Sequence, residues 1–313
     1  MRTDRVHEPD DADRFVLSRP SILTGDNGLT RRQPRADTSE RFFTVRDNPF
    51  DVSEYESVPG EVDDEAEIPT DHPRYDDLVS RHRIEAGVER GITHLQGMHA
   101  EGRGSAFDYL LGEETIASAD EAARAAAAHL LLADHPVLSI NGNVAALVPE
   151  EVVELATVDD ADLEVNLFNR TPERVGAIAS HLRAHGATDV KGITADARIP
   201  GLDHLRAKVD ADGIYTADVV VVPLEDGDRA EALDAMGKTA IVIDLNPLSR
   251  SARIADVPIV DNVLRAVPNV TDHARVLADE STAERRRIVE EFDPDGALKA
   301  AERRIRSGDM TGP

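Results

Sequence analysis

The clearest pattern along the chain is a series of short apolar runs between residues 136 and 265, separated by segments of helical character. The runs are rich in β-branched residues, which is typical of strands buried on both faces of a sheet. Strands that alternate with helices pair in parallel through right-handed crossovers. We therefore expect an α/β fold built on a Rossmann-like, doubly wound, mostly parallel sheet. The strand runs lie at 137–140, 163–168, 218–223, 239–245 and 257–260, with a weaker one at 189–193.

The segments between the strand runs carry helix signals. Thr171 is a good N-cap, and Pro172 follows it at the first helical position, where proline is tolerated. Residues 197–213 show no periodicity and are expected to be irregular. The expected helices of the core are at about 144–156, 171–186 and 228–236.

The segment before the core also has helical character. Residues 75–91 are expected to form a helix, and Gly102-Arg103-Gly104 predicts a loop before a short helix at 106–111. Ser118 with Glu121 has the spacing of a capping box, which predicts the start of an alanine-rich helix that ends near residue 133.

The tail from residue 267 is expected to be mostly helical, with a polar break at 293–296. These patterns divide the ordered chain into a helical N-terminal segment at 68–135, the Rossmann-like core at 136–265 and a helical C-terminal segment at 266–313.

Residues 1–67 show no sustained periodicity. They contain five prolines, and the stretch 51–67 has eight acidic residues and no basic one. This composition predicts a disordered acidic extension. It would be a functional arm, a dispensable tail, or the product of a start codon assigned too far upstream.

The overall charge is strongly acidic. The 313 residues include 61 Asp and Glu against 35 Lys and Arg, a net charge of −26, and only four of the basic residues are lysines. Such a surface suits a cytosol that contains molar salt, where self-repulsion is screened. We expect a salt-accumulating halophile as the source, with a merely acidic protein of a mesophile as the alternative. Nucleic acid is disfavoured as a partner, because phosphate backbones attract basic surfaces.

Composition excludes several further classes of protein. The chain has no cysteine, which rules out disulfides, thiolate metal sites and a cysteine nucleophile. The longest apolar run, at 219–224, is too short to span a bilayer, and no secretory signal is visible. We expect a cytoplasmic protein without a membrane partner.

Candidate chemistry follows the strands, because ligands of such sheets bind beyond the carboxyl ends of the strands. Asn141-Gly142-Asn143 follows the first strand and can present backbone N–H groups to an anion, such as a substrate phosphate. The acidic turn with Glu225, Asp226 and Asp228 follows the 218–223 strand. Its carboxylates favour Mg²⁺, although helix capping and surface charge explain them equally well.

A second group of polar residues follows the 239–245 strand. Asp244 and Asn246 can bind ribose hydroxyls or a base edge, and Arg250 and Arg253 can bind phosphates. Arg81 and Arg103 from the N-terminal segment are candidates to close over the phosphates. Arg103 is the better candidate, since the flanking glycines permit a close backbone approach.

The chain resembles archaeal phosphopantothenate synthetases, also called 4-phosphopantoate–β-alanine ligases. The resemblance covers about 68–305, and its runs occur in one order. They are His72-Pro73-Arg74-Tyr75, Gly102-Arg103-Gly104 with 106–110, Asn141-Gly142-Asn143 with 145–147, 164–168, 223–229, 236–238, 244–251 and 260–262.

The resemblance implies a homodimeric ligase with a Rossmann-like fold. It implies that ATP, 4-phosphopantoate and β-alanine give 4′-phosphopantothenate, AMP and diphosphate, through an acyl-adenylate, on the route to coenzyme A. Glu101 and Ser105 depart from the family pattern beside Arg103, so no catalytic histidine is expected there. The implied ATP-binding residues are Arg81, Arg103, Asp244, Leu245, Asn246, Arg250, Ser251, Asn262 and Val263.

Two other functions remain open from the residues alone. An NADP-dependent reductase would use Arg170, after the second strand, to bind the 2′-phosphate, but the glycine fingerprint of such enzymes is missing. A regulatory protein that binds a nucleotide without turnover would share the same residues, and an assay must separate it from the ligase.

Overall fold

The structure is a computed structural model. It describes residues 68–308 except 70, 73, 225 and 226, so the predicted extension at 1–67 lies outside the described residues. In chain order the described elements are α1 (Tyr75–Glu89), α2 (Leu95–Leu111), α3 (Ala117–Leu132), β1 (Pro136–Ile140), α4 (Gly142–Leu147), α5 (Pro149–Asp159), β2 (Asp162–Val165), α6 (Pro172–Ala184), β3 (Ala197–Arg198), β4 (Lys208–Val209), β5 (Val219–Pro223), α7 (Gly227–Ala235), β6 (Thr239–Ile243), α8 (Arg250–Ile254), β7 (Val257–Ile259), α9 (Val263–Ala278), α10 (Thr282–Glu291) and α11 (Pro294–Ser307).

The central sheet has the strand order β2-β1-β5-β6-β7, and every neighbouring pair is parallel. The predicted α/β fold with a parallel sheet is therefore confirmed. Successive strands are added on opposite sides of β1, so the direction of winding reverses between β1 and β5. In open parallel sheets, a crevice forms at such a reversal beyond the carboxyl ends of the strands, and it is the usual place for a ligand.

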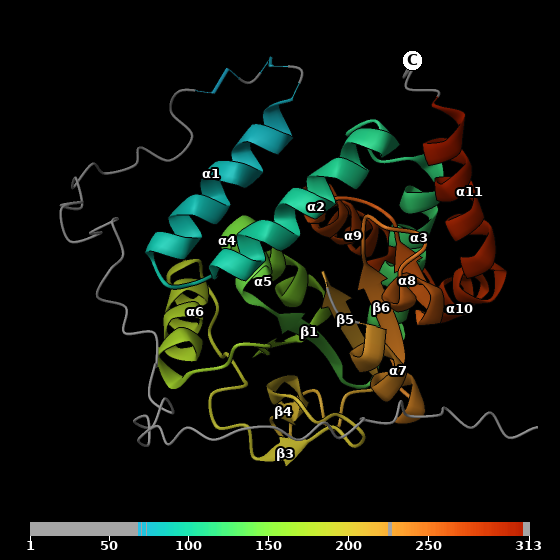
Figure 1. Cartoon of the computed structure of the whole chain (residues 1–313). Helices are drawn as coiled ribbons and strands as arrows, with labels where there is room; N and C mark the ends of the chain where they lie inside the picture. Colours follow the sequence, from blue (N-terminus) through green and yellow to red (C-terminus); the bar gives the residue numbers. More distant parts are fainter. Residues whose placement is uncertain (1–67, 70, 73, 225–226, 309–313) are drawn as a thin grey trace, which may run out of the picture. The chain divides into compact units, whose positions relative to one another are not determined.

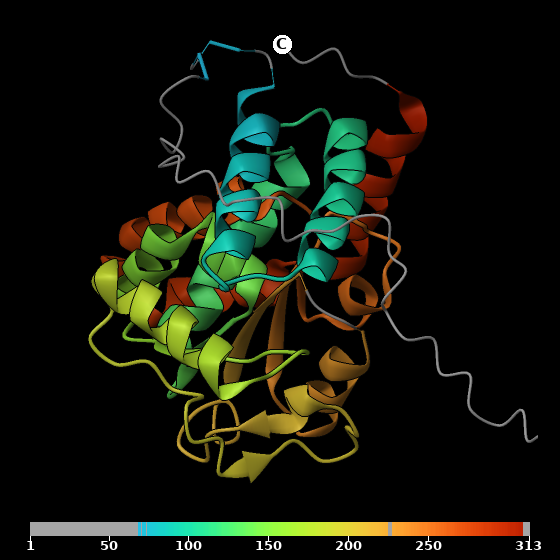
Figure 2. The same ribbon diagram turned by 60° about the vertical axis from the view of Figure 1, so that its left-hand side comes forward.

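Both faces of the sheet are buried, as the β-branched runs predict. Val219 and Val221 point into a core shared with α3, α5 and α9, whereas Val220 and Val222 point to the other side. That second face is covered by α7 and by the segment that contains the β3–β4 hairpin. Figures 1 and 2 show this hairpin on the side of the sheet away from α1 and α2. The doubly wound layering is thus present, with a small hairpin in place of a second full helical layer.

Helix α2 is one continuous helix, so the predicted loop at Gly102-Arg103-Gly104 is wrong. Two glycines inside a helix cost about 1 kcal/mol each relative to alanine, but burial of Glu101, Asp108 and Leu111 anchors this helix on its neighbours. His94 caps its start by accepting from the N–H of Gln96, and Gly112 ends it in a left-handed conformation. Figure 1 shows α1 and α2 lying above the upper ends of the sheet strands.

Other local predictions have mixed outcomes. Thr171 accepts from the N–H of Arg174 and caps α6, as expected. The capping box at Ser118 is wrong, because α3 already begins at Ala117 and Ile116 occupies the cap position without a side-chain bond. The helix expected at 144–156 is divided into α4 and α5, since Pro149 cannot continue the hydrogen bonding of α4.

Two strand predictions also needed correction. The weak strand expected at 189–193 is reduced to a single parallel bridge between Glu164 and Lys191. The segment 197–213, expected to be irregular, contains the β3–β4 hairpin. The tail has a break between α10 and α11, but it lies at 292–293 and not at 293–296, because Asp293 caps α11 and Pro294 already begins that helix. Within the described part of the chain, no helix combines the length and apolar character needed to cross a membrane.

Candidate active site

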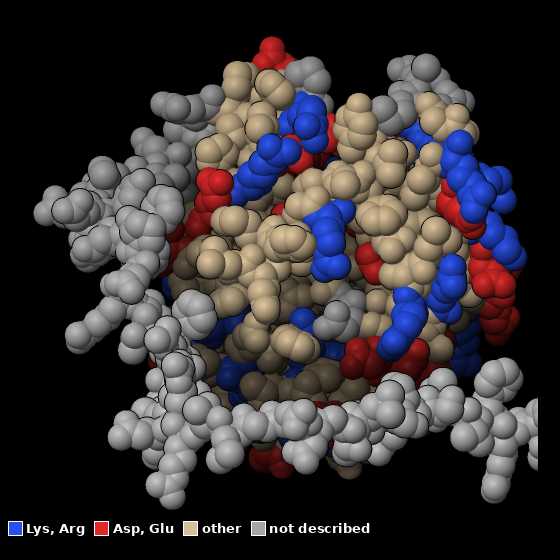
Figure 3. Space-filling model, in the orientation of Figure 1, with Lys and Arg blue, Asp and Glu red and all other residues tan. Residues whose placement is uncertain are grey.

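A cavity of about 950 Å³ lies between α2 and the carboxyl ends of the sheet strands. All five strands of the central sheet contribute a following residue or loop to its wall, and the link from α1 to α2 closes it from above. The hollow below α2 shows blue side chains in Figure 3, although the protein as a whole is acidic. Of the described residues that line the cavity, four are arginines and three are acids, namely Arg103, Arg174, Arg206 and Arg250 with Glu101, Asp228 and Asp244.

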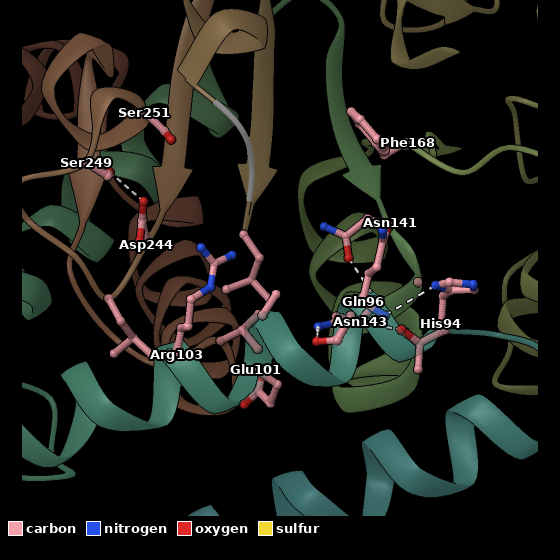
Figure 4. A pocket seen from close by; sticks show the side chains of 18 of the residues that line it. His94, Gln96, Glu101, Arg103, Asn141, Asn143, Phe168, Asp244, Ser249 and Ser251 are labelled. Atoms are coloured by element: carbon pink, nitrogen blue, oxygen red, sulfur yellow. Dashed lines mark hydrogen bonds between the residues drawn. The ribbon is translucent and has the colours of Figure 1, made fainter. Parts of the chain in front are cut away.

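One part of the cavity, which we call the β6 end, is formed by Arg103, Asp244, Asn246 and Arg250. Figure 4 shows the Arg103 side chain rising from α2 toward Asp244. The Asp244 carboxylate accepts from Ser249 Oγ at 2.5 Å and from the N–H of Asn246 at 2.9 Å. Burial raises the pKa of Asp244, while these bonds and the charge of Arg103 offset part of the rise. Predicted ATP-binding residues from two distant segments thus lie together.

The turn that precedes α8 is packed tightly at this end. Arg250 lines the cavity and its Nε lies 3.4 Å from Glu231 Oε1. Gly227 must remain without a side chain, since a Cβ there would come within 2.4 Å of the Arg250 Cβ. Leu245, Ser251 and Val263 line the same wall, as expected from the resemblance, whereas Arg253 does not line the cavity.

Asn262 lines the cavity, but both polar atoms of its side-chain amide are hydrogen bonded within the protein. Its Oδ1 accepts from the N–H of Leu264 and caps α9, and its Nδ2 donates to Asp108 Oδ2 at 2.8 Å. Arg265 joins the same group, with Nη2 at 2.5 Å from Asp108 and 2.8 Å from Asp261. These bonds fasten α2 to the start of α9, so Asn262 positions the helix that carries Arg103.

The turn Asn141-Gly142-Asn143 lies in the middle of the cavity (Figure 4). Asn141 Oδ1 accepts from the N–H groups of Asn143 and Val144, and its Nδ2 donates to the Pro223 carbonyl. Asn143 accepts from Thr93 Oγ1 and donates to the Gly97 carbonyl. Both side chains are therefore occupied in joining β1 to β5 and to α2, and the backbone N–H groups of Asn143 and Val144 already have an acceptor in Asn141.

The opposite part of the cavity, which we call the β2 end, is formed by Phe168, Asn169, Arg174 and Arg206. Arg206 Cζ lies 5.9 Å from the centre of the Phe168 ring. Arg174 donates to the carbonyl of Asn169 at 2.6 Å. Sequence reasoning marked the turn after β2 but missed both arginines, because one lies inside α6 and the other in a segment expected to be irregular.

The predicted magnesium ligands are only partly described. Glu225 and Asp226 lie outside the described residues, and Asp228 lines the cavity with its Oδ2 at 3.0 Å from His204 Nε2. Burial acts to raise the pKa of Asp228, but the hydrogen bond from His204 and backbone N–H groups bring it below its ordinary value. Nowhere in the described residues do three or more Asp, Glu or His side chains gather to hold a metal.

Two further residues from the sequence analysis, Arg81 and Glu101, differ in whether they line the cavity. Arg81 does not line the cavity, and its guanidinium pairs with Asp77 on α1 at 2.6 Å. Glu101 does line it and is buried. Burial, reinforced by the nearby charges of Asp108 and Asp77, raises the pKa of Glu101 to about 7. Position 101 therefore places a buried carboxyl group with a raised pKa at the wall of the cavity.

The fold and this cavity define an α/β protein with a polar, arginine-rich pocket at the reversal point of a parallel sheet. The model of the phosphopantothenate/pantothenate synthetase family matches residues 118–308. The chain therefore belongs to this family.

Curated relatives agree with that assignment. The chain is 59% identical to a 4-phosphopantoate–β-alanine ligase of Thermococcus onnurineus and 56% identical to one of Thermococcus kodakarensis, each over 227 residues, which is 72% of this chain and 87% of the relative. It is 52% identical over 235 residues to the ligase of that name from Methanosarcina mazei, which is 75% of this chain and 92% of the relative. The reductase alternative loses its support, because the Arg170 guanidinium donates to the carbonyls of Val165, Gly192 and Ile193 and does not line the cavity.

Proposed function

We propose that this chain is an ATP-dependent ligase that joins (R)-4-phosphopantoate to β-alanine. The products would be 4′-phosphopantothenate, AMP and diphosphate, in coenzyme A biosynthesis. The proposal is supported by the family of the chain and by the name that its curated relatives share. The observation that carries it is the cavity, which has arginines at both ends and therefore suits two phosphorylated substrates.

The reaction needs activation of a carboxylate. A carboxylate is a poor acyl donor, because its leaving group would be oxide. When a carboxylate oxygen attacks the α-phosphorus of ATP, diphosphate leaves and an acyl-adenylate forms. The β-alanine nitrogen then attacks the acyl carbon, loses a proton and expels AMP. Such chemistry depends on neutralised phosphate charge and on in-line positioning.

In this proposal ATP lies at the β6 end. Arg103 and Arg250 neutralise its phosphates, and Asp244 and Asn246 bind the nucleoside. The carboxylate of Asp244 is fixed by Ser249 and by the N–H of Asn246, so it would meet a ribose hydroxyl without reorganisation. Leu245, Ser251, Asn262 and Val263 complete the wall. Arg81 does not line the cavity of its own chain and pairs with Asp77 at 2.6 Å, so its contact with ATP stays a prediction from the resemblance.

Magnesium is expected to accompany the nucleotide. Mg²⁺ keeps several waters and is usually bound through phosphates and one or two carboxylates. Asp228 lines the cavity and meets that requirement as a single carboxylate. When bound, the ion would neutralise phosphate charge.

We also propose a homodimer. Leu95, Tyr109 and Leu110 on α2 expose 66%, 49% and 42% of their surface, which is unusual for large apolar side chains on one helix. Sedimentation velocity in molar KCl would return a monomer mass if this proposal is wrong. The cytoplasmic location stays a prediction.

The test of function is AMP release from the purified chain in molar KCl, with each substrate omitted in turn. The ligase requires ATP, 4-phosphopantoate and β-alanine together for turnover, and a chelator should abolish it. A regulatory nucleotide binder would bind ATP and release no AMP under any of these conditions.

A further inference from the structure

Helix α2 is held on its neighbours by very few buried side chains. Its buried residues are Glu101, Asp108 and Leu111, so Glu101 is the one buried residue in the first half of the helix. Figures 1 and 2 show α2 running beside α1. The charge state of the Glu101 carboxyl group therefore affects how this half of α2 packs.

The carboxyl group of Glu101 has no cation to balance a negative charge. The groups that act on it are Asp77 and Ser80 of α1 and Asp108 of α2 itself, and both aspartates raise its pKa. No arginine, lysine or histidine in the described part of the chain acts to lower it. A buried carboxylate without a cation is costly, because it loses its hydration and gains no partner in return.

The two neighbouring aspartates are already paired with arginines. On α1, the Asp77 carboxylate lies 2.6 Å from Arg81 Nη2, and Arg74 pairs with it from the start of the helix. Asp108 pairs with Arg265 of α9 at 2.5 Å. The arginines around this group are therefore engaged by the aspartates, and the glutamate between them is the carboxyl group that takes a proton near neutral pH.

The hydrogen bonding of Ser80 fits a protonated Glu101. Ser80 Oγ donates its one hydrogen to the Asp77 carbonyl oxygen at 3.0 Å. Its hydrogen bond with Glu101 therefore takes its hydrogen from the carboxyl group. Ionisation of Glu101 would remove this bond and would leave two acceptor oxygens facing each other inside the protein.

Arg103 lies two positions after Glu101 on the same helix and points toward Asp244 (Figure 4). Successive helical residues are about 100° apart around the axis, so the side chains of Glu101 and Arg103 leave α2 on nearly opposite sides. A shift of α2 that brings water to Glu101 would therefore also move Arg103 relative to the β6 end of the cavity.

We propose that Glu101 is a positioning residue, whose proton keeps the first half of α2 packed on α1 with Arg103 directed at the β6 end. Loss of this proton loosens the first half of α2 and weakens the binding of nucleotide phosphates, so the site responds to pH near neutrality. The inference deepens the proposed function, on which it rests for the identity of the nucleotide.

The test measures hydrogen exchange of the α2 amides and the dissociation constant of ATP in molar KCl, from about pH 6 to 8.5. Exchange in the first half of α2, corrected for its intrinsic dependence on pH, should rise above pH 7 in the wild type and not in Glu101→Gln. The dissociation constant of the wild type, divided by that of Glu101→Gln, should rise roughly tenfold from about pH 7 to 8.5, because the protonated form becomes scarce. Both proteins meet the same ionic forms of ATP, so this ratio isolates Glu101.

Asp159→Asn is the matched control. Asp159 is a buried residue on α5 whose pKa is also raised to about 7 by burial, but it does not line the cavity. Its replacement should leave the pH profiles of α2 exchange and ATP binding unchanged. Glu101→Met keeps a long side chain without a charge and should behave as Glu101→Gln does, which keeps the test decisive if one variant folds poorly.

The same pH profiles in the wild type and in both Glu101 variants would overturn the inference. Loss of the profiles in Asp159→Asn would overturn it as well, since the pH response would then belong to the whole fold. The proposed function fails on a different result, namely that the wild type releases no AMP from ATP, 4-phosphopantoate and β-alanine at any pH. Exchange of the α2 amides does not depend on that result.

Discussion

Some side chains that line the cavity are already hydrogen bonded within the protein, whereas Arg103 points into the cavity without such a bond. Asn141, Asn143 and Asn262 have both ends of their amides bonded within the protein. Arg103 is exposed, and it forms no hydrogen bond or ion pair with any other residue that the structure describes, while its charge still acts on Asp244. Loss of the first group would damage the fold, whereas loss of Arg103 would remove charge from the site alone.

Arg103→Ala is therefore expected to slow adenylate formation without lowering the stability of the fold. The variant should lose roughly 10- to 100-fold in adenylate formation, because a charge-assisted phosphate contact is removed. The measurement is isotope exchange between diphosphate and ATP in the presence of 4-phosphopantoate. Arg253→Ala, on α8 and outside the cavity lining, should keep wild-type exchange. Exchange by Arg103→Ala at the wild-type rate would show that Arg103 does not contact ATP.

At the scale of elements, the sequence predicts the helices and strands whose formation depends on the local pattern of residues. It fails where a contact between residues far apart in the chain determines the structure. The strands β5 and β6 follow from their β-branched runs, and the start of α6 follows from Thr171 and Pro172. Helix α2 could not be predicted, since glycines at 102 and 104 indicate a loop until packing is known. Gly104 lies where a Cβ would come within 3.4 Å of Leu245, a contact 141 positions away along the chain.

The continuity of α2 can be tested at Gly102, where a Cβ would meet open space. Gly102→Ala should raise the free energy of unfolding by about 0.5–1 kcal/mol, because alanine is the better helix residue and has fewer unfolded conformations. Urea denaturation measures this. Gly112→Ala is the control and should destabilise, since its φ of +104° suits glycine. A loss of stability in Gly102→Ala would mean that residue 102 does not lie in a helix.

At the scale of the whole molecule, the location of the site was predictable but not its full content. The sheet order places every strand end at one edge, so polar residues after the strands had to meet there. The β6 end was found in this way and through the family resemblance. The β2 end was missed, because Arg206 reaches the cavity from a short 3-10 turn, Leu205–Ala207, in a segment without sequence periodicity. The carbonyl of Arg206 accepts from Asn166 just after β2, and such a contact between distant residues cannot be read from the local sequence.

The net charge of −26 makes a prediction for the molecule as a whole. Repulsion among the acidic residues opposes folding, and the Debye length falls from about 10 Å at 0.1 M salt to about 3 Å at 1 M. The temperature of unfolding should therefore rise steeply between 0.1 and 1 M KCl and then level off. Scanning calorimetry at several KCl concentrations measures it. Sodium chloride at equal ionic strength should act alike, because screening does not depend on which monovalent cation is present. A rise that continues linearly to 3 M would instead indicate exclusion of salt from the protein surface, and an unchanged unfolding temperature would mean that the acidic surface does not require salt.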